Sequence, residues 1–346
     1  MGMGRELLAG VALGAAILAA SCGGGGGGDK PSEAPASAAG QVFALMDVGD
    51  PPATLDAFAA HPELDGLAFR TSWKILEPLP GAHDWSTLDA ALQAVRARGK
   101  KLTLHVGVAS RGLPGWLAPM GSATYTYRAP GGELVTEPVP WDPVFLSRYE
   151  ALVAALAAHI RARGDGELLH AVSDGAPVAE MSLAGCRDAR LADGMPYGRS
   201  QYLDAWKRTV DAHAGSFPAT RLLVSAPVAV ICMPDNDGKA FYTEVMNHAL
   251  AASANAMVFA ADLNAAGSAR LAQVDAPLRA RAGVAFQMIW SSTGDTQDRM
   301  QGPLEAAVCQ GLGSGGRYFE IYKADLSSTD AAVRGAIRRA RAGQPC

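Results

Sequence analysis

From residue 41 onward, short apolar segments rich in β-branched and aromatic residues alternate with longer segments whose apolar residues have helical spacing. One such helical segment, WSTLDAALQAVRARG, places Leu88, Leu92 and Val95 on one stripe and Gly99 just past its end. This alternation is typical of repeated strand-helix units. The expected strands are VFALMD (42–47), GLAFR (66–70), KLTLHVGV (101–108), LLHAVSD (168–174), RLLVSAPV (221–228), AMVFAA (256–261), VAFQMIW (284–290) and RYFEIY (317–322).

Eight strands that alternate with helices predict an α/β protein with a single (β/α)8 barrel over residues 41–346. An open, doubly wound sheet is the alternative. Such a sheet would carry a glycine-rich phosphate loop after its first strand, and the segment MDVGDPPAT is not of that kind.

The first 22 residues have the pattern of an export signal. Arg5 precedes the apolar stretch LLAGVALGAAILAA, and the sequence ASC follows. The segment around Cys22 resembles the lipobox of bacterial lipoproteins, although Ala19 stands where a leucine is usual. Residues 23–40 are rich in Gly, Pro, Ser and Ala and predict a linker. We therefore expect a lipid-anchored protein of the cell envelope, with Gly23 favouring the outer membrane; a periplasmic or secreted protein is the alternative.

The remaining cysteines are Cys186, Cys232, Cys309 and Cys346, and none has a C-x-x-C spacing. An exported protein can oxidise them, so we expect disulfides rather than a metal site. Of the three possible pairings, we expect Cys186 with Cys232 and Cys309 with Cys346. The net charge of −4, without a block of Lys or Arg, argues against nucleic acid or an anionic lipid surface as a partner. Membrane contact is expected through the anchor only, and the oligomeric state stays open.

The carboxyl ends of the expected strands carry the candidate chemistry, because these ends converge at the mouth of a (β/α)8 barrel. If RYFEIY is a strand, Glu320 and Tyr322 share its inward face. Neither a Ser/His/Asp set nor a metal-binding cluster occurs there, and no cofactor is expected. Acidic, amide and aromatic groups of this kind suit a neutral polyhydroxylated ligand such as a sugar. The residues that close or follow the strands are Asp47, Arg70, Trp73, His105, Asp174, Glu180, Asp262, Gln287, Trp290, Glu320 and Tyr322.

Four segments resemble (β/α)8 glycoside hydrolases of the family 42 β-galactosidase and family 5 kind. One of them, WDPVFLSRYEALVAALAAHI (141–160), is similar to the helix before their fourth strand. GLAFRTSWKILEPLPGAHDWSTLD (66–89) is similar to their second strand and the segment that follows it. LHVGVASRGLPGWL (104–117) is similar to the third strand with its Pro-x-Trp segment, and AVSDGAPVAEMSL (171–183) to the loop after the fourth.

The resemblance implies a retaining glycosidase with a carboxylic acid after strand four, which Glu180 matches, and a carboxylate nucleophile late in the chain, which Glu320 matches. Two departures stand out. Ala179 takes the place of the usual Asn, and Glu320 falls on the eighth strand whereas Gln287 lies on the seventh, where the nucleophile normally lies. Either the strand count is one too high or the arrangement is divergent.

The sequence thus predicts an enzyme that hydrolyses an extracellular or periplasmic oligo- or polysaccharide, with Glu180 and Glu320 as catalytic carboxylates. A catalytically inactive glycan-binding lipoprotein is the alternative. Glu320 could instead form a salt bridge with Arg70, and Asp174 and Asp262 are reserve carboxylates. Glu77 is expected to be structural, as are Trp85 and Trp206. The residues expected to bind substrate are Arg70, Trp73, His105, Trp116, Gln287, Trp290 and Tyr322, although each Trp could only pack a loop.

Overall fold

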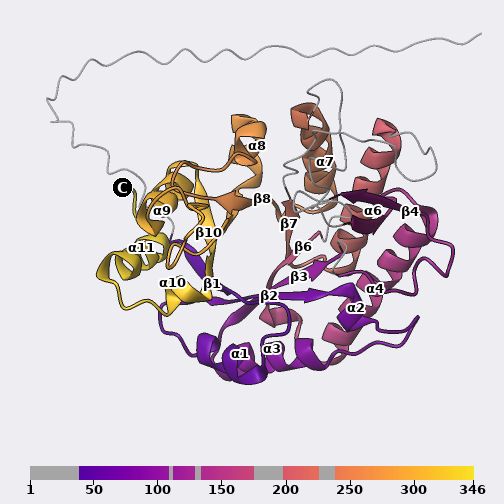
Figure 1. Ribbon diagram of the computed structural model, residues 1–346, viewed down its shortest axis with the longest axis horizontal. Helices are drawn as coiled ribbons and strands as arrows, with labels where there is room; N and C mark the ends of the chain where they lie inside the picture. Colours follow the sequence, from indigo (N-terminus) through magenta and orange to yellow (C-terminus); the bar gives the residue numbers. More distant parts are fainter. Residues whose placement is uncertain (1–38, 109–111, 129–133, 175–197, 226–237) are drawn as a thin grey trace, which may run out of the picture. The chain divides into compact units, whose positions relative to one another are not determined.

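The computed structural model describes residues 39–108, 112–128, 134–174, 198–225 and 238–346. Eight parallel strands form a closed barrel in the order β1-β10-β9-β8-β7-β6-β3-β2 (Figure 1). Each matches one of the eight expected strands, which confirms the (β/α)8 fold. The strands are β1 (Gln41–Leu45), β2 (Gly66–Ser72), β3 (Lys101–Gly107), β6 (Leu169–Ser173), β7 (Arg221–Ser225), β8 (Ala256–Leu263), β9 (Val284–Met288) and β10 (Gly316–Tyr322).

The strand count places Glu320 on the eighth barrel strand, β10, and Gln287 on the seventh, β9. The two residues are neighbours in the parallel register of these strands. The question that the sequence left open is therefore settled: no strand was counted in excess, and the late glutamate lies one strand beyond its usual place in the families that the sequence resembles.

Helices surround the barrel on the outside (Figure 1). Among the described helices, α4 (Pro143–Ala162) and α11 (Ala331–Ala342) begin at aspartates whose side chains cap them. Asp142 accepts from the Phe145 amide at 2.7 Å, and Asp330 accepts from the amides of Ala332 and Val333. In the described part of the chain, no helix combines the length and hydrophobicity needed to cross a membrane. The helices are α1 (Pro52–Ala59), α2 (Trp73–Leu76), α3 (Ser86–Ala97), α4 (Pro143–Ala162), α6 (Arg199–Ser216), α7 (Gly238–Ala252), α8 (Ala276–Ala282), α9 (Leu304–Gly313), α10 (Lys323–Leu326) and α11 (Ala331–Ala342), with short 3-10 turns η1 (Gly166–Leu168) and η4 (Leu271–Gln273).

Apolar side chains form two separate cores. The larger one lies between the strands and the helices, and it includes the predicted stripe of α3 and the fully buried Trp206. The smaller one fills the barrel, where Phe43, Phe259 and Tyr318 are its largest members. Interior positions alternate with exterior ones along each strand, and these apolar side chains occupy most of the barrel interior.

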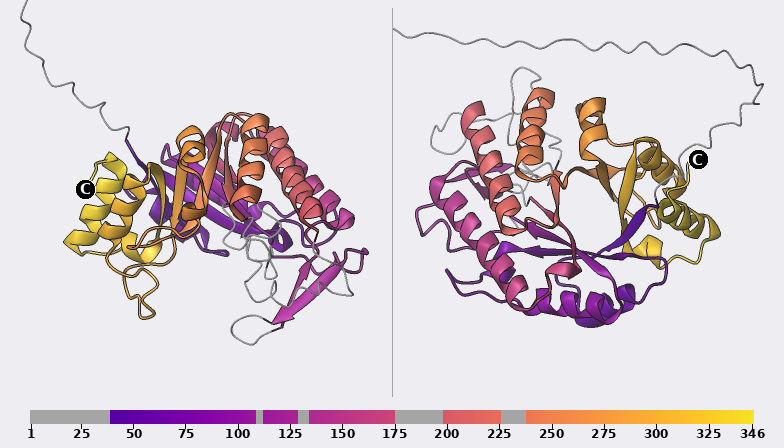
Figure 2. Two further views of the ribbon diagram at one scale, coloured as in Figure 1. Left: turned by 90° about the horizontal axis from the view of Figure 1, so that it is seen from above. Right: turned by 180° about the vertical axis from the view of Figure 1, so that it is seen from behind.

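A two-stranded antiparallel hairpin, β4 (Thr124–Arg128) and β5 (Leu134–Pro138), is inserted between β3 and α4. It projects from one end of the barrel (Figure 2, left). This hairpin is not among the strands expected from the sequence. The alternation of Thr and Tyr in TYTYR was the available signal, because β-branched and aromatic residues with period two favour a strand.

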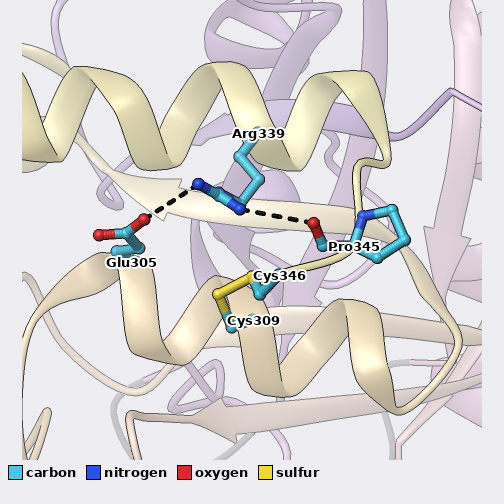
Figure 3. The surroundings of a disulfide bond; sticks show 5 residues. All are labelled: Glu305, Cys309, Arg339, Pro345 and Cys346. Carbon is cyan, nitrogen blue, oxygen red and sulfur yellow. Dashed lines mark hydrogen bonds and ion pairs between the residues drawn. A yellow bond between two sulfur atoms is a disulfide. The ribbon is translucent and has the colours of Figure 1, made fainter.

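A disulfide joins Cys309 of α9 to Cys346 at the end of the chain, with a Cα–Cα separation of 5.6 Å (Figure 3). This disulfide is the pairing that was expected from the sequence for Cys309 and Cys346. Beside it, Arg339 of α11 lies 3.2 Å from the carboxylate of Glu305 and donates to the carbonyl of Pro345 at 3.4 Å. The last residues of the chain are thus bound to both α9 and α11. Cys22, Cys186 and Cys232 lie outside the described residues.

Candidate active site

Glu320 is a fully buried carboxylate inside the barrel, near the carboxyl end of β10. Its Oε1 atom accepts a hydrogen bond from the Tyr318 hydroxyl at 2.7 Å and lies 2.7 Å from Nε2 of His105. Its Oε2 atom is also buried and has no hydrogen-bond partner among the described residues. Burying a carboxylate is costly unless its oxygens are hydrogen-bonded. A buried carboxylate oxygen without a hydrogen-bond partner therefore needs an explanation, and a catalytic role is one.

Tyr318 is a permanent donor to this carboxylate. Burial, followed by the negative charge of Glu320 and the hydrogen bond to it, raises the pKa of Tyr318 well above its usual value. The phenol therefore stays protonated throughout the working pH range of a protein. Its hydrogen bond fixes the position of Oε1.

His105 of β3 is the member of this cluster nearest to solvent, with 13% of its side chain exposed whereas Glu320 has none. Its ring packs against Phe259 at 5.4 Å between centroids. With Glu320 ionised, Nε2 must carry the hydrogen that lies between the two groups. The structure thus brings two predicted site residues, Glu320 and His105, into direct contact.

Arg70, the residue opposite His105 in the β2–β3 register, is held by other partners than Glu320. Its Nη2 atom forms an ion pair with Asp47 at 2.5 Å, and its Nε donates to the carbonyl of Met46 at 2.8 Å. Arg70 and Glu320 therefore do not form the salt bridge that was the alternative expectation. Arg70 braces the end of β1 against β2.

Lys323, at the start of α10, extends the ion-pair network of Arg70 and Asp47 along the rim of the barrel, at the carboxyl ends of its strands. Its Nζ atom lies 2.9 Å from Asp47 and 2.5 Å from Asp50. The two cations, Arg70 and Lys323, thus each pair with carboxylates of the β1–α1 connection. Asp47 is 56% exposed, so this network meets solvent at the barrel mouth.

Two of the three tryptophans that were expected to stack on a sugar pack against other protein side chains instead. Trp73 is fully buried on α2, packs against Phe145 and Tyr149, and donates its indole N–H to the Glu77 carboxylate at 2.8 Å. A stacking role for Trp73 is therefore wrong. Trp116 is half-buried, meets Trp73 edge-on at 5.8 Å, and donates to the carbonyl of Glu77 at 3.1 Å. Glu77 holds both indoles in place, in keeping with its expected structural role.

Trp290 and Tyr322 lie together on the rim, where the chain leaves β9 and β10. Trp290 is 38% exposed, and its ring centroid is 5.7 Å from that of Tyr322. The guanidinium of Arg299 lies 4.3 Å from the Trp290 ring centroid. Sequence reasoning missed Arg299, because nothing in its neighbourhood indicates that its loop folds back over Trp290. Two non-glycine residues of this loop, Asp298 and Gln301, have positive φ angles of 50° and 51°.

The two reserve carboxylates have hydrogen-bond partners of their own. Asp262 accepts hydrogen bonds from the Ser268 hydroxyl and from the Arg270 amide, the latter at 3.0 Å. Asp174 is fully buried and accepts from the amide and hydroxyl of Ser225 at 3.1 and 3.2 Å. Asp262 thus stabilises the segment that follows β8, whereas Asp174 links the carboxyl ends of the neighbouring strands β6 and β7.

Glu180 lies outside the described residues, so the separation of the two expected catalytic carboxylates is a matter for experiment. Within the described ranges, no group of three or more His, Cys, Asp or Glu side chains is arranged to hold a metal ion. The candidate site in the described residues therefore consists of the buried carboxylate of Glu320, the imidazole of His105, the phenol of Tyr318 and the aromatic rings at the rim.

Comparison with known proteins identifies the fold class. No protein-family model and no curated protein matches the chain. Among solved structures, a β-galactosidase from the psychrophilic Marinomonas ef1 matches with a TM-score of 0.55 and 12% identity, over 87% of this chain and 59% of that one. The exo-β-1,4-mannosidase Op5Man5 from Opitutaceae bacterium strain TAV5 matches with a TM-score of 0.50 and 14% identity, over 86% and 55%.

The chain spans little more than half the length of these two enzymes. At such low identity the likeness shows the fold, which agrees with the closed barrel described above. The protein is thus a (β/α)8 barrel protein, and its chemistry has to be argued from its own residues.

Proposed function

We propose that the protein is a glycoside hydrolase that acts on an oligo- or polysaccharide. One observation carries this proposal: the buried carboxylate of Glu320 has one oxygen held by two neighbours and the other without a hydrogen-bond partner in the described part of the chain. Glu320 attacks the anomeric carbon or stabilises its developing positive charge. Glu180 protonates the leaving oxygen and then activates water.

The contacts of Glu320 fit the requirements of a nucleophile. Such a carboxylate must be ionised, must be fixed in orientation, and must keep one oxygen lone pair directed at the reacting carbon. Tyr318 and His105 both contact Oε1, whereas the buried Oε2 has no hydrogen-bond partner among the described residues. Since His105 is the partly exposed member of the pair, the substrate approaches Glu320 from its side of the barrel.

Two further observations support a sugar ligand. Trp290 and Tyr322 present aromatic surface at the rim, and such rings stack on the apolar C–H faces of sugars. Gln287, half-buried beside Glu320 in the strand register, offers an amide for hydroxyl groups. The two solved structures described above carry glycosidase names, and they support the proposal by analogy of fold.

The test is hydrolysis of a panel of 4-nitrophenyl glycosides and of β-1,4-mannan, xylan and galactan by the wild type, Glu320→Ala and Glu180→Ala. We expect Glu180→Ala to lose about 10²- to 10⁴-fold in turnover, the usual contribution of a catalytic acid or base. Glu320→Ala should lose at least as much, because it removes the attacking carboxylate. Glu244→Gln is the control, because Glu244 lies on α7, paired with Arg199 on the outside of the barrel.

Added azide separates the two roles. If the mechanism is retaining, azide should restore turnover to Glu320→Ala with a glycosyl azide of inverted configuration, and to Glu180→Ala with one of retained configuration. Unchanged hydrolysis in both variants would overturn the assignment. Saturable oligosaccharide binding by the wild type with no product release would select the inactive glycan-binding alternative.

We also propose that the protein is exported and anchored through a lipid on Cys22, at the outer membrane. The disulfide between Cys309 and Cys346 supports an oxidising compartment. Membrane fractions of cells that express the wild type should contain the protein, and Cys22→Ala should release it. A Cys22→Ala protein that stays in the membrane fraction would contradict the anchor.

A further inference from the structure

A polar hollow of about 260 Å³ lies at the amino-terminal end of the barrel strands, the opposite end from the rim described above. Lys101, Leu169 and Arg221 are the first residues of β3, β6 and β7, and Asn255 directly precedes β8. His170 and Ala219 complete the lining. The hollow thus has two cations, an imidazole and an amide, and none of its six lining residues is acidic.

The two cations of this hollow are not balanced by carboxylates. Among the described residues, neither Lys101 nor Arg221 forms an ion pair. The Lys101 ammonium donates to the carbonyl of Glu167 at 2.5 Å. The Arg221 guanidinium lies 3.3 and 3.4 Å from the two ring nitrogens of His170. The cations at the other end of the barrel, in contrast, pair with Asp47 and Asp50. Two like charges around one hollow repel each other, so this end favours an anion.

His170 forms the floor of the hollow. It is 7% exposed and packs against Phe43 and Tyr318, with ring centroids at 4.8 and 5.5 Å. Burial, and then the charges of Arg221 and Lys101, lower the pKa of His170 to about 3. Its ring is therefore neutral at pH 7, with one N–H donor and one acceptor nitrogen.

We propose that this hollow binds a small oxyanion of the phosphate type, either inorganic phosphate or a phosphate monoester. Arg221 and Lys101 supply the charged contacts, and His170 and Asn255 supply neutral donors. The planar fork of an arginine with an adjacent lysine suits a tetrahedral oxyanion that carries more than one negative charge. The site is independent of the hydrolase proposal, because it lies at the other end of the barrel and shares no residue with the rim.

Titration calorimetry of the full-length protein at low ionic strength tests this site, with inorganic phosphate and glycerol 3-phosphate as separate probes. We expect saturable binding of at least one probe to the wild type and a rise in melting temperature that sodium chloride of equal ionic strength does not reproduce. Arg221→Gln and Lys101→Gln should each weaken binding at least about tenfold, since each removes a charge-assisted contact. Arg221→Lys, which keeps the charge, should weaken it less.

Arg148→Gln is the matched control, because Arg148 is an exposed arginine of α4 outside the hollow and its loss changes the net charge equally. It should bind phosphate as the wild type does. Absence of saturable heat with both probes would overturn the proposal. So would equal weakening by Arg148→Gln and Arg221→Gln, since only the overall charge would then matter. Tighter binding of glycerol 3-phosphate than of phosphate would assign the site to a monoester.

Discussion

At the scale of single residues, the hydrogen bond from the Tyr318 phenol fixes the orientation of the Glu320 carboxylate. Tyr318→Phe removes one of the two contacts to Oε1, and we expect kcat/KM to fall about 10- to 100-fold, since a hydrogen bond to a charged group contributes about 1.5–3 kcal/mol. Tyr242→Phe is the control: its buried hydroxyl donates to the carbonyl of Val224 at 2.9 Å, away from the site. Both variants should lose stability, but only Tyr318→Phe should lose activity. Equal kcat/KM in the two variants would remove Tyr318 from the site.

A second prediction at this scale concerns acid. His213 is buried on α6, its Nε2 lies 3.0 Å from the Tyr149 hydroxyl, and burial lowers its pKa to about 4. The unfolded chain takes up a proton near pH 6.5, whereas the folded chain does so only near pH 4. The free energy of unfolding should therefore fall as the pH falls from about 6.5 to about 4, by up to about 3 kcal/mol from this residue.

Urea denaturation at several pH values measures this slope. In His213→Phe the slope between pH 6.5 and pH 4 should become shallower, although the loss of the contact with Tyr149 costs about 1 kcal/mol at pH 7. His248→Gln is the control, because His248 is partly exposed on α7 and pairs with Asp211. An unchanged slope in His213→Phe would show that other groups determine the acid sensitivity.

At the scale of elements, one buried carboxylate fixes the loop between β9 and α9. Asp325 of α10 is fully buried and accepts four hydrogen bonds from Ser292 and Thr293, two from backbone amides and two from hydroxyls, at 2.8–3.0 Å. This loop carries both Trp290 and Arg299. Because α10 directly follows β10, these hydrogen bonds of Asp325 act as a clamp. The clamp fixes the loop between β9 and α9 to the strand that bears Glu320.

Asp325→Ala should therefore lower the free energy of unfolding by about 3 kcal/mol or more, since it leaves buried donors unpaired. It should also speed tryptic cleavage after Arg299 in the native protein, because the loop loses its anchor. Asp330→Ala is the control, because Asp330 caps α11 through the amides of Ala332 and Val333 and does not contact the loop. It should cost about 1 kcal/mol and leave cleavage after Arg299 unchanged. Equal cleavage in both variants would contradict the clamp.

The eight barrel strands were predictable, whereas the hairpin of β4 and β5 and the contacts at the strand ends were not. The eight barrel strands are apolar runs between helical segments, and that pattern depends only on local sequence. Trp73 shows the limit: a tryptophan after a strand looks the same whether it faces a ligand or, as here, is turned into the core by the single turn of α2. The pairing of Arg70 with Asp47, and of Glu320 with His105, depends on which strands are neighbours across the barrel and on side-chain reach.

At the scale of the whole molecule, the first and last strands of the barrel meet. Five residues of β1 pair with β10, from Gln41 with Tyr318 to Leu45 with Tyr322. Every barrel needs such a closure, and here it joins segments that are about as far apart in the sequence as the barrel allows. The segments that carry β1 and β10 must therefore stay paired for Glu320 to keep its place between β1 and β9.

The disulfide between Cys309 and Cys346 secures the C-terminal side of this closure, because it fixes the segment after α11 to α9 (Figure 3). Cys346→Ser opens a covalent loop with a sequence separation of 37 residues. The chain-entropy relation gives a loss of about 3–4 kcal/mol in the free energy of unfolding for a loop of this length. Urea denaturation should show a lower midpoint together with a larger m value, since the unfolded chain without the cross-link exposes more surface. Dithiothreitol is the internal control: once both proteins are reduced, the wild type and Cys346→Ser should have the same midpoint. If reduction shifts the wild type but the variant melts like the oxidised protein, a different cysteine pair stabilises the fold.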